Sequence, residues 1–114
     1  MKGRVDALYV CTDSFANSNR GVINASALAA RLPTMQGFRD ATRAGGLMSY
    51  GANFPALFRR AAEKVDMILL GAKPGDLPVE QPSQFDFVLN LKTAEALGLA
   101  LPPPLLAAAE EVIE

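Results

Sequence analysis

The chain of 114 residues contains no histidine and a single cysteine, and these absences exclude most catalytic and metal-binding chemistry. Without histidine there is no Ser-His-Asp or Cys-His nucleophile and no imidazole ligand for a metal ion. One cysteine cannot build a disulfide framework or a thiolate zinc site within one chain. We therefore expect no catalytic residue and no metal site, which is the pattern of a protein that is not an enzyme.

An excess of charge of one sign is also missing. Eleven Lys and Arg residues face twelve Asp and Glu residues, for a formal net charge of −1. A near-neutral chain has no general attraction for nucleic acid or for an anionic membrane. Neither a GxGxxG nor a Walker pattern occurs, so we expect no nucleotide and no other cofactor.

Long apolar runs are absent. The longest apolar stretches, around residues 97–106, contain prolines and are shorter than the roughly 20 residues that a membrane span requires. The basic start, Met1-Lys2-Gly3-Arg4, is followed by an apolar run that contains Asp6 and stops at Cys11. Because this run is short and interrupted, we expect no export signal in this chain.

What is present is an alternation of strand and helix patterns, which indicates one α/β domain with a Rossmann-like, three-layer parallel sheet. The expected strands are Val5–Cys11, Pro33–Gln36, Leu47–Tyr50 and Phe85–Leu91. The expected helices run from Asn17 or Ser18 to Pro33, over 38–44, over Asn53–Leu70, over Lys92–Leu97 and from Pro102 through Leu105–Ile113. Strict alternation in Phe85–Leu91 indicates one wet face and an edge position, and Cys11 is expected to be an inert core thiol.

The helix expected over Asn53–Leu70 has the clearest pattern. Its apolar residues recur at spacings of three and four, and its charged residues fall mostly on the other face. We expect Asn53 to be its N-cap and Gly71 to follow its C-terminus.

Three loops are candidates for ligand binding, because ligands of doubly wound sheets lie beyond the carboxyl ends of the strands. They cover residues 12–19, 36–39 and 49–53. In the first loop, Asp13 can accept hydrogen bonds from a ligand amine or hydroxyl, and Ser14 follows it. The alternative is that Asp13 is a turn or cap residue, since Asp favours both.

Ser49, Tyr50 and Gly51 form the second candidate group. Gly51 allows the backbone to approach a ligand, and Tyr50 offers a flat face and a hydroxyl. The alternative is a strand end with a packed aromatic ring. Phe15 and Phe38 are candidates for the wall of a pocket, with plain core packing as the alternative.

Three motifs, GGLMSYG, GAKPGDLPVEQP and NLKTAEALGL, occur in this order, downstream of ALYVCTDSFANSNRGVINASALAARLPTMQGFRD. Together they resemble the C-terminal part of the tryptophan/tyrosine-type substrate-binding proteins of ABC transporters, which are type I periplasmic binding proteins. The resemblance spans nearly the whole chain. It implies two α/β lobes that close on a small solute, such as an amino acid, and pass it to a membrane permease driven by an ATPase.

Under this resemblance, residues 1–46 would be the end of the second lobe. Residues 47–84 would hold a crossover strand, the long helix and a connection, and residues 85–114 the C-terminal strand and helices. The resemblance also implies a periplasmic location and places Asp13, Ser49, Tyr50 and Gly51 at the border of the ligand cleft. The resemblance further implies that the first lobe would lie outside these 114 residues.

Two functions remain open at this point. The first is solute recognition for an ABC importer, and the second is a ligand-sensing regulator or a small stand-alone enzyme domain, because fold alone does not assign function. We further expect the chain to self-associate, since the apolar face of residues 53–70 lacks its usual partner.

Overall fold

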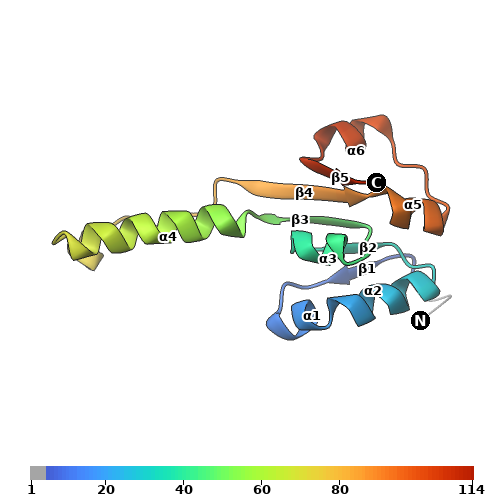
Figure 1. Cartoon of the computed structure of the whole chain (residues 1–114), viewed down its shortest axis with the longest axis horizontal. Coiled ribbons are helices and arrows are strands. Elements are labelled where there is room, and N and C mark those ends of the chain that lie inside the picture. The colour runs from blue at the N-terminus through green and yellow to red at the C-terminus, as the bar shows by residue number, and fades with distance from the viewer. Residues whose placement is uncertain (1–4) are drawn as a thin grey trace. The chain divides into compact units, whose positions relative to one another are not determined.

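The computed structural model describes residues 5–114, so the basic start of the chain lies outside the described residues. These residues form helices and a five-stranded sheet (Figure 1). The chain divides into two compact units. We call Met1–Gly51 with Asp86–Glu114 the sheet unit, and Ala52–Phe85 the helix unit.

The elements alternate along the chain as expected for an α/β fold. The strands are β1 (Leu8–Val10), β2 (Thr34–Gln36), β3 (Met48–Ala52), β4 (Phe85–Asn90) and β5 (Glu111–Ile113). The helices are α1 (Ser14–Ser18), α2 (Arg20–Ala29), α3 (Arg39–Arg43), α4 (Phe54–Leu69), α5 (Leu91–Leu97) and α6 (Pro103–Ala108), with a 3-10 turn at Pro74–Asp76.

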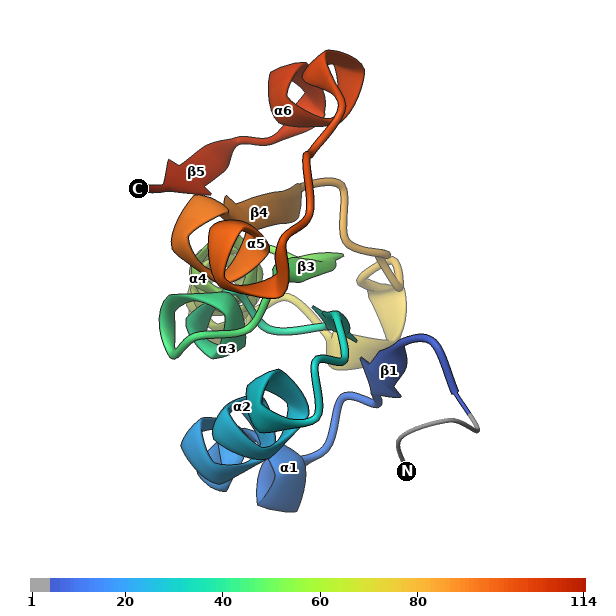
Figure 2. The ribbon, with the colours of Figure 1, turned by 90° about the vertical axis from the view of Figure 1, so that its right-hand side faces the viewer.

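The sheet has the order β1-β2-β3-β4-β5. β1, β2 and β3 pair in parallel, as do β4 and β5. Asn90 N donates to Leu47 O, and Asn53 N donates to Gln84 O. The partner's residue number falls along β4 as the number rises along β3, so these two strands are antiparallel. Helices α2, α3 and α5 lie on one face of the sheet, and α6 lies on the other (Figure 2).

Three expectations about these elements were wrong. β4 is not an edge strand: it lies between β3 and β5, and its last three residues are buried. The last helix does not reach Ile113 but stops at Ala108, and the strand β5 follows it. The sequence did not predict β5, because three residues that pair with a distant strand leave little local pattern. Cys11 is exposed, since β1 already ends at Val10.

The first helix also begins earlier than expected. It starts at Ser14 with Asp13 as its N-cap, not at Asn17 or Ser18, and a break at Asn19 separates α1 from α2. The prediction of the long helix is confirmed: the Asn53 side chain accepts a hydrogen bond from Ala56 N at 2.8 Å, and Gly71 follows with φ +108°. Such a φ favours glycine.

A buried polar network, which the sequence patterns did not reveal, joins the helices to the sheet. Asn24 on α2 accepts a bond from Gln36 Nε2 at 2.5 Å and donates to Ala41 O at 2.7 Å. Asn90 donates to Thr42 O at 3.1 Å and caps α5 by accepting from Thr93 N at 3.0 Å. Because both asparagines are buried, each bond satisfies a group that has no access to water.

We predict that Asn90→Ala lowers the free energy of unfolding by about 1.5–2.5 kcal/mol. The substitution removes a helix cap and one of the two hydrogen bonds to the Thr42 carbonyl, which keeps its bond from Gly45 N. These losses cost about 1 kcal/mol and about 0.5–1.5 kcal/mol. Asn19→Ala is the matched control, because Asn19 makes an exposed bond to Phe15 O. Urea denaturation measures both variants, and equal losses would contradict the role of the network.

Candidate functional site

The carboxyl ends of β1, β2 and β3 lie level at one edge of the sheet unit. Val10 is in register with Gln36, and Gln36 is in register with Ser49. The residues that follow this level are 12–15 after β1, 37–39 after β2, and 50–51 at the end of β3. We call these residues the carboxyl edge. It brings together the loops that the sequence predicted.

The backbones of two strand ends approach each other closely at the carboxyl edge. A Cβ atom at Gly51 would lie 2.0 Å from the carbonyl oxygen of Gly37. A Cβ atom at Gly37 would lie 2.1 Å from Thr12 Oγ1. Only glycine fits at position 51 without a shift of the neighbouring backbone, and this explains the glycine more directly than ligand approach does.

Asp13 caps α1, as the structural alternative predicted. Its Oδ1 accepts bonds from Phe15 N at 2.8 Å and from Ala16 N at 3.1 Å. Within residues 5–114 its Oδ2 accepts no hydrogen bond, and the residue is exposed. The cap therefore holds the carboxylate in one orientation and leaves one oxygen for a ligand donor.

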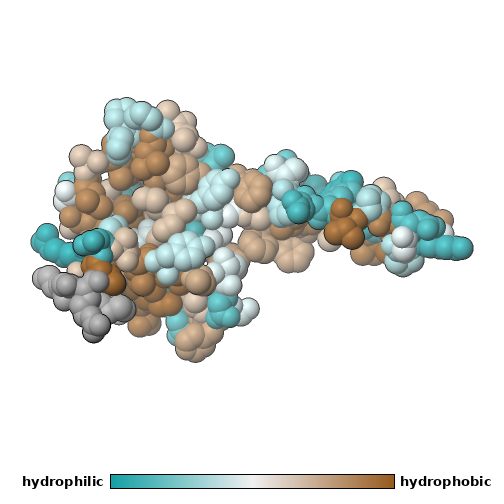
Figure 3. Space-filling model, turned by 180° about the vertical axis from the view of Figure 1, so that it is seen from behind, coloured by the Kyte–Doolittle hydropathy of each residue, from teal (hydrophilic) through white to brown (hydrophobic). Residues whose placement is uncertain are grey.

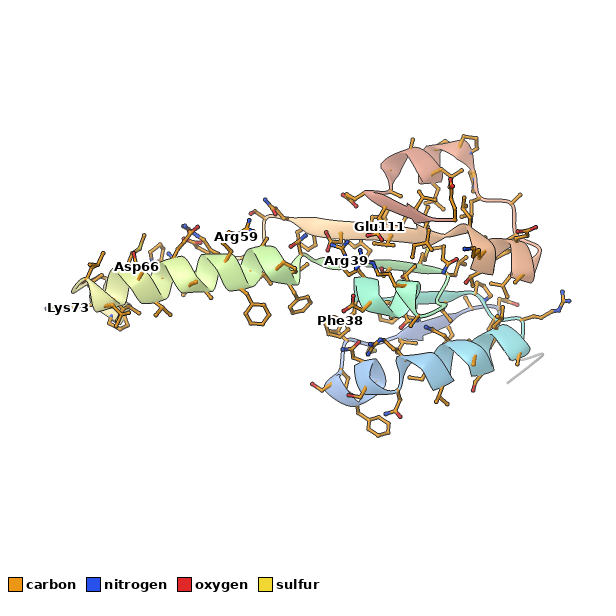
Figure 4. The ribbon with its side chains drawn as sticks, viewed as in Figure 1. Phe38, Arg39, Arg59, Asp66, Lys73 and Glu111 are labelled. Carbon is orange, nitrogen blue, oxygen red and sulfur yellow. The ribbon has the colours of Figure 1, made fainter. Side chains whose placement is uncertain are left out.

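The aromatic candidates at the carboxyl edge are accessible to different degrees. Phe15 is 78% exposed, so core packing does not account for it. Phe38 is half-buried at the N-cap position of α3, beside Arg39 (Figure 4). Tyr50 is exposed and stands edge-on to Phe87, with ring centroids 6.3 Å apart. Ser14 is the exposed first residue of α1.

Ser49 differs from the other candidates because it is only 1% exposed. Adjacent strand residues point to opposite faces, so Ser49 lies on the Gln36 face and Tyr50 on the other. Among the described residues, Ser49 Oγ has no hydrogen-bond partner. That Ser49 contacts a ligand remains a prediction. Because its side chain is buried, it is less accessible to a ligand than the side chains of Asp13 and Tyr50.

An ion-pair cluster lies next to Phe38. Arg39 binds Asp86 on β4 at 3.3 Å and Glu111 on β5 at 2.6 Å, and Arg43 Nη2 binds Glu111 at 2.9 Å (Figure 4). The hydrogen bond from Arg43 holds the pKa of Glu111 below its usual value. Partial burial opposes this shift in pKa, and the hydrogen bond from Arg39 adds to it. Two carboxylates thus compensate Arg39, which is not a free cation for a ligand.

Sequence reasoning missed this cluster, because each arginine and the carboxylate that it binds are 47 to 72 residues apart along the chain. A local signal for it does not exist: each residue has the charge pattern of an ordinary surface position. The pairing of β5 with β4 is what brings Glu111 to α3.

The helix unit contains a groove of about 640 Å³ between α4 and residues 74–84. Three of its charged side chains compensate one another, because Glu80 binds Arg60 Nε at 2.6 Å and Lys64 Nζ at 2.7 Å. The bonds from Arg60 and Lys64 lower the pKa of Glu80 to about 2. Glu80 is thus committed to ion pairs within the helix unit, whereas Asp13 at the carboxyl edge keeps an accessible carboxylate oxygen, so the carboxyl edge is the stronger candidate site.

The described part of the chain has no helix that is long and apolar enough to cross a membrane. Nor do the Cys, Asp and Glu side chains of the described residues form a group of three that could hold a metal ion.

Comparison with known proteins identifies the family. A family model described as ABC transporter substrate binding protein matches residues 1–113. The chain belongs to the ABC transporter substrate-binding protein family. The resemblance in its motifs and the α/β fold of periplasmic binding proteins are thereby confirmed.

The relatives of this family member are longer than the chain itself. A tyrosine-binding protein of Clostridioides difficile (strain R20291) is 27% identical over 97 residues, which are 85% of this chain and 28% of that protein. An ABC domain from Streptococcus pneumonia, solved in complex with L-Trp, is 29% identical with a TM-score of 0.90 over 98% of this chain and 38% of that chain.

A conserved domain protein from Vibrio cholerae O1 is 28% identical with a TM-score of 0.89, over 96% of this chain and 37% of that chain. The chain thus spans between 28% and 38% of the length of these three relatives.

We predict that Gly51→Ala destabilises the fold by about 1–3 kcal/mol, the usual cost of overpacking. The control is Gly21→Ala in α2, where a Cβ atom meets nothing within 4 Å. There alanine should stabilise the helix by about 0.5–1 kcal/mol. Urea denaturation of both variants checks this, and a change of the same sign in both would refute the close approach.

We also predict a pH-dependent contribution of Glu111. A carboxylate with a folded-state pKa below its unfolded value stabilises the fold above the unfolded pKa, which is about 4.3 for Glu. This contribution is lost as the pH falls through the folded pKa. The gap in unfolding free energy between wild type and Glu111→Gln should therefore shrink from pH 6 to pH 3.

The control for this titration is Glu95→Gln, which removes an exposed carboxylate on α5. A constant gap between wild type and Glu111→Gln would contradict the ion-pair cluster.

Proposed function

We propose that this chain forms one wall of the solute site in an ABC importer and that the solute is an aromatic amino acid. It would be bound without catalysis in a cleft between two lobes and then handed to a permease driven by an ATPase. The observation that carries the proposal is the carboxyl edge, where parallel strands end together under an accessible carboxylate and aromatic rings. Ligands of open α/β sheets bind at such edges.

The chemistry of the carboxyl edge suits an amino acid. The free Oδ2 of Asp13 can accept hydrogen bonds from an ammonium group, and bonds of this charged kind are the strong ones. Tyr50, Phe15 and Phe38 offer apolar and aromatic surface for a side chain. The relative solved in complex with L-Trp and the relative named for tyrosine support this solute class.

The arrangement of lobes is part of the proposal. Residues 1–46 and 85–114 would belong to the second lobe, and residues 47–84 would cross toward the first. The face of β1–β3 that α2 and α3 do not cover exposes Tyr9 and Tyr50, although parallel strands are ordinarily covered on both faces. This supports a larger lobe in the complete protein, acting in the periplasm or outside the cell.

We predict that L-tryptophan or L-tyrosine binds this chain weakly, in the millimolar range that a single wall provides. A titration of the ¹⁵N-labelled chain should shift the amides of residues 12–15, 37–39 and 50–51. The amides of residues 74–84 in the helix unit should stay in place. Saturable shifts confined to the helix unit, or no saturable shift, would contradict the proposal.

Two substitutions of Asp13 separate its capping role from ligand binding. Asp13→Asn keeps a good cap, because Asn and Asp cap equally well, but it removes the negative charge. We expect it to keep the fold and to weaken binding about tenfold or more. Asp13→Ala loses both functions. Equal affinity of wild type and Asp13→Asn would exclude Asp13 as the partner of the ammonium group.

A further inference from the structure

The chain passes between the sheet unit and the helix unit at two places. It leaves the sheet unit after Gly51, near the end of β3, and returns to it at Asp86 in β4. We call these two places the crossings. Because the backbone joins the two units only there, any movement of one unit against the other bends the chain at the crossings.

Residues 37–39 of the carboxyl edge contact the sheet-unit side of both crossings. The carbonyl oxygen of Gly37 lies so close to Gly51 that a Cβ atom there would be 2.0 Å away. Two residues later along the chain, Arg39 Nη1 binds Asp86 Oδ2 at 3.3 Å. Phe38, which belongs to the proposed solute wall, lies between these two contacts in the sequence. A displacement of Phe38 therefore acts on both crossings over a short length of chain.

The side chain of Arg39 is held firmly enough to transmit such a displacement. Its Nη2 binds Glu111 at 2.6 Å, so the guanidinium bridges two carboxylates. The side chain of Arg39 is 30% exposed and that of Asp86 is 15% exposed, and partly buried ion pairs are screened less by salt than exposed ones. Helix α3 itself is held near its other end by the buried polar network.

The contacts of Arg39 do not depend on what covers the surface of the chain. Apolar side chains are exposed on both units (Figure 3), among them Tyr9 and Phe58. The relatives of the chain are longer, so in a longer protein such side chains have further partners. Arg39, Asp86 and Glu111, in contrast, all lie within the sheet unit and bind one another there.

We infer that Arg39 is a positioning residue that couples the solute wall to the crossings. It anchors the start of β4 to the loop that carries Phe38, so a solute bound against Phe38 also fixes the crossing at Asp86. The part that concerns the solute rests on the proposed function. The anchoring of Asp86 by Arg39 does not.

An ion pair that only stabilises the fold is the alternative, and Arg43 serves as its example. Arg43 lies one turn further along α3 and binds Glu111 through Nε at 3.0 Å and Nη2 at 2.9 Å. Within residues 5–114 its ion pairs are with Glu111 and Asp40, and none is with Asp86. The loss of either arginine removes bonds to Glu111, but only the loss of Arg39 removes the ion pair with Asp86. Arg43→Gln is therefore the matched control for Arg39→Gln.

Amide hydrogen exchange of the free chain tests the anchoring, because the β3–β4 pair has one reporter at each end. The amide of Asn53 donates to Gln84 O beside the crossings. The amide of Asn90 donates to Leu47 O at the far end of the same pair. Local opening at the crossings exposes the first amide alone, whereas a loss of global stability exposes both.

Arg39→Gln and Asp86→Asn should each raise the exchange rate of the Asn53 amide about fivefold relative to that of the Asn90 amide, because the start of β4 loses its anchor. The double variant should equal either single variant, since both remove the same pair. Arg43→Gln should change the two rates by the same factor. An unchanged ratio of the two rates in Arg39→Gln and Asp86→Asn overturns the anchoring, as does an equal rise of the ratio in Arg43→Gln.

A titration of the ¹⁵N-labelled chain with L-tryptophan tests the coupling to the solute. In the wild type, amide shifts at residues 12–15 and 50–51 should be accompanied by shifts at residues 84–86. In Arg39→Gln the first group should still shift and residues 84–86 should not, whereas Arg43→Gln should behave as the wild type. Shifts at residues 84–86 that persist without Arg39 overturn the coupling. A wild type without shifts at residues 12–15 and 50–51 contradicts the proposed function instead, and the exchange rates then decide the anchoring alone.

Discussion

The contact between the backbones of Gly37 and Gly51 is the constraint on which the candidate site depends. Two parallel strands end so close together that a single methyl group at Gly51 would meet a carbonyl oxygen at 2.0 Å. Gly37 also lies against Thr12, so the segment around Gly37 connects the loop after β1 with the end of β3. The side chains of the carboxyl edge can act on one ligand only because these strand ends converge.

Polar interactions, more than apolar ones, fix the surroundings of this edge. Asn24 and Gln36 join α2 to β2, Asn90 joins α3 to α5, and Glu111 ties α3 to the last strand. Most of these groups are buried or partly buried, so each lost bond leaves a desolvated partner. Such networks define one geometry more sharply than apolar contacts, and a wall of a binding site needs a defined geometry.

Local patterns in the sequence were sufficient for the α/β class, the long helix with its Asn53 cap and the loops of the carboxyl edge. They also indicated the first strand, which they extended over Val5–Cys11 where β1 covers only Leu8–Val10. They failed where the outcome depends on distant residues. β4 alternates like an edge strand but is covered because the three-residue strand β5 pairs beside it. The charges of Arg39 and Glu111 have no local pattern, and the role of Asp13 as a cap could not be separated from ligand binding.

The central claim is that the carboxyl edge of β1–β3 contacts an aromatic amino acid. Intermolecular nuclear Overhauser effects between unlabelled L-tryptophan and the isotope-labelled chain test it most directly, because they locate the ligand itself. The account predicts effects from the indole protons to the rings of Phe38 and Tyr50 and to residues 13–15. Effects confined to α4 and residues 74–84, or none at a ligand concentration that saturates the shifts, would contradict it.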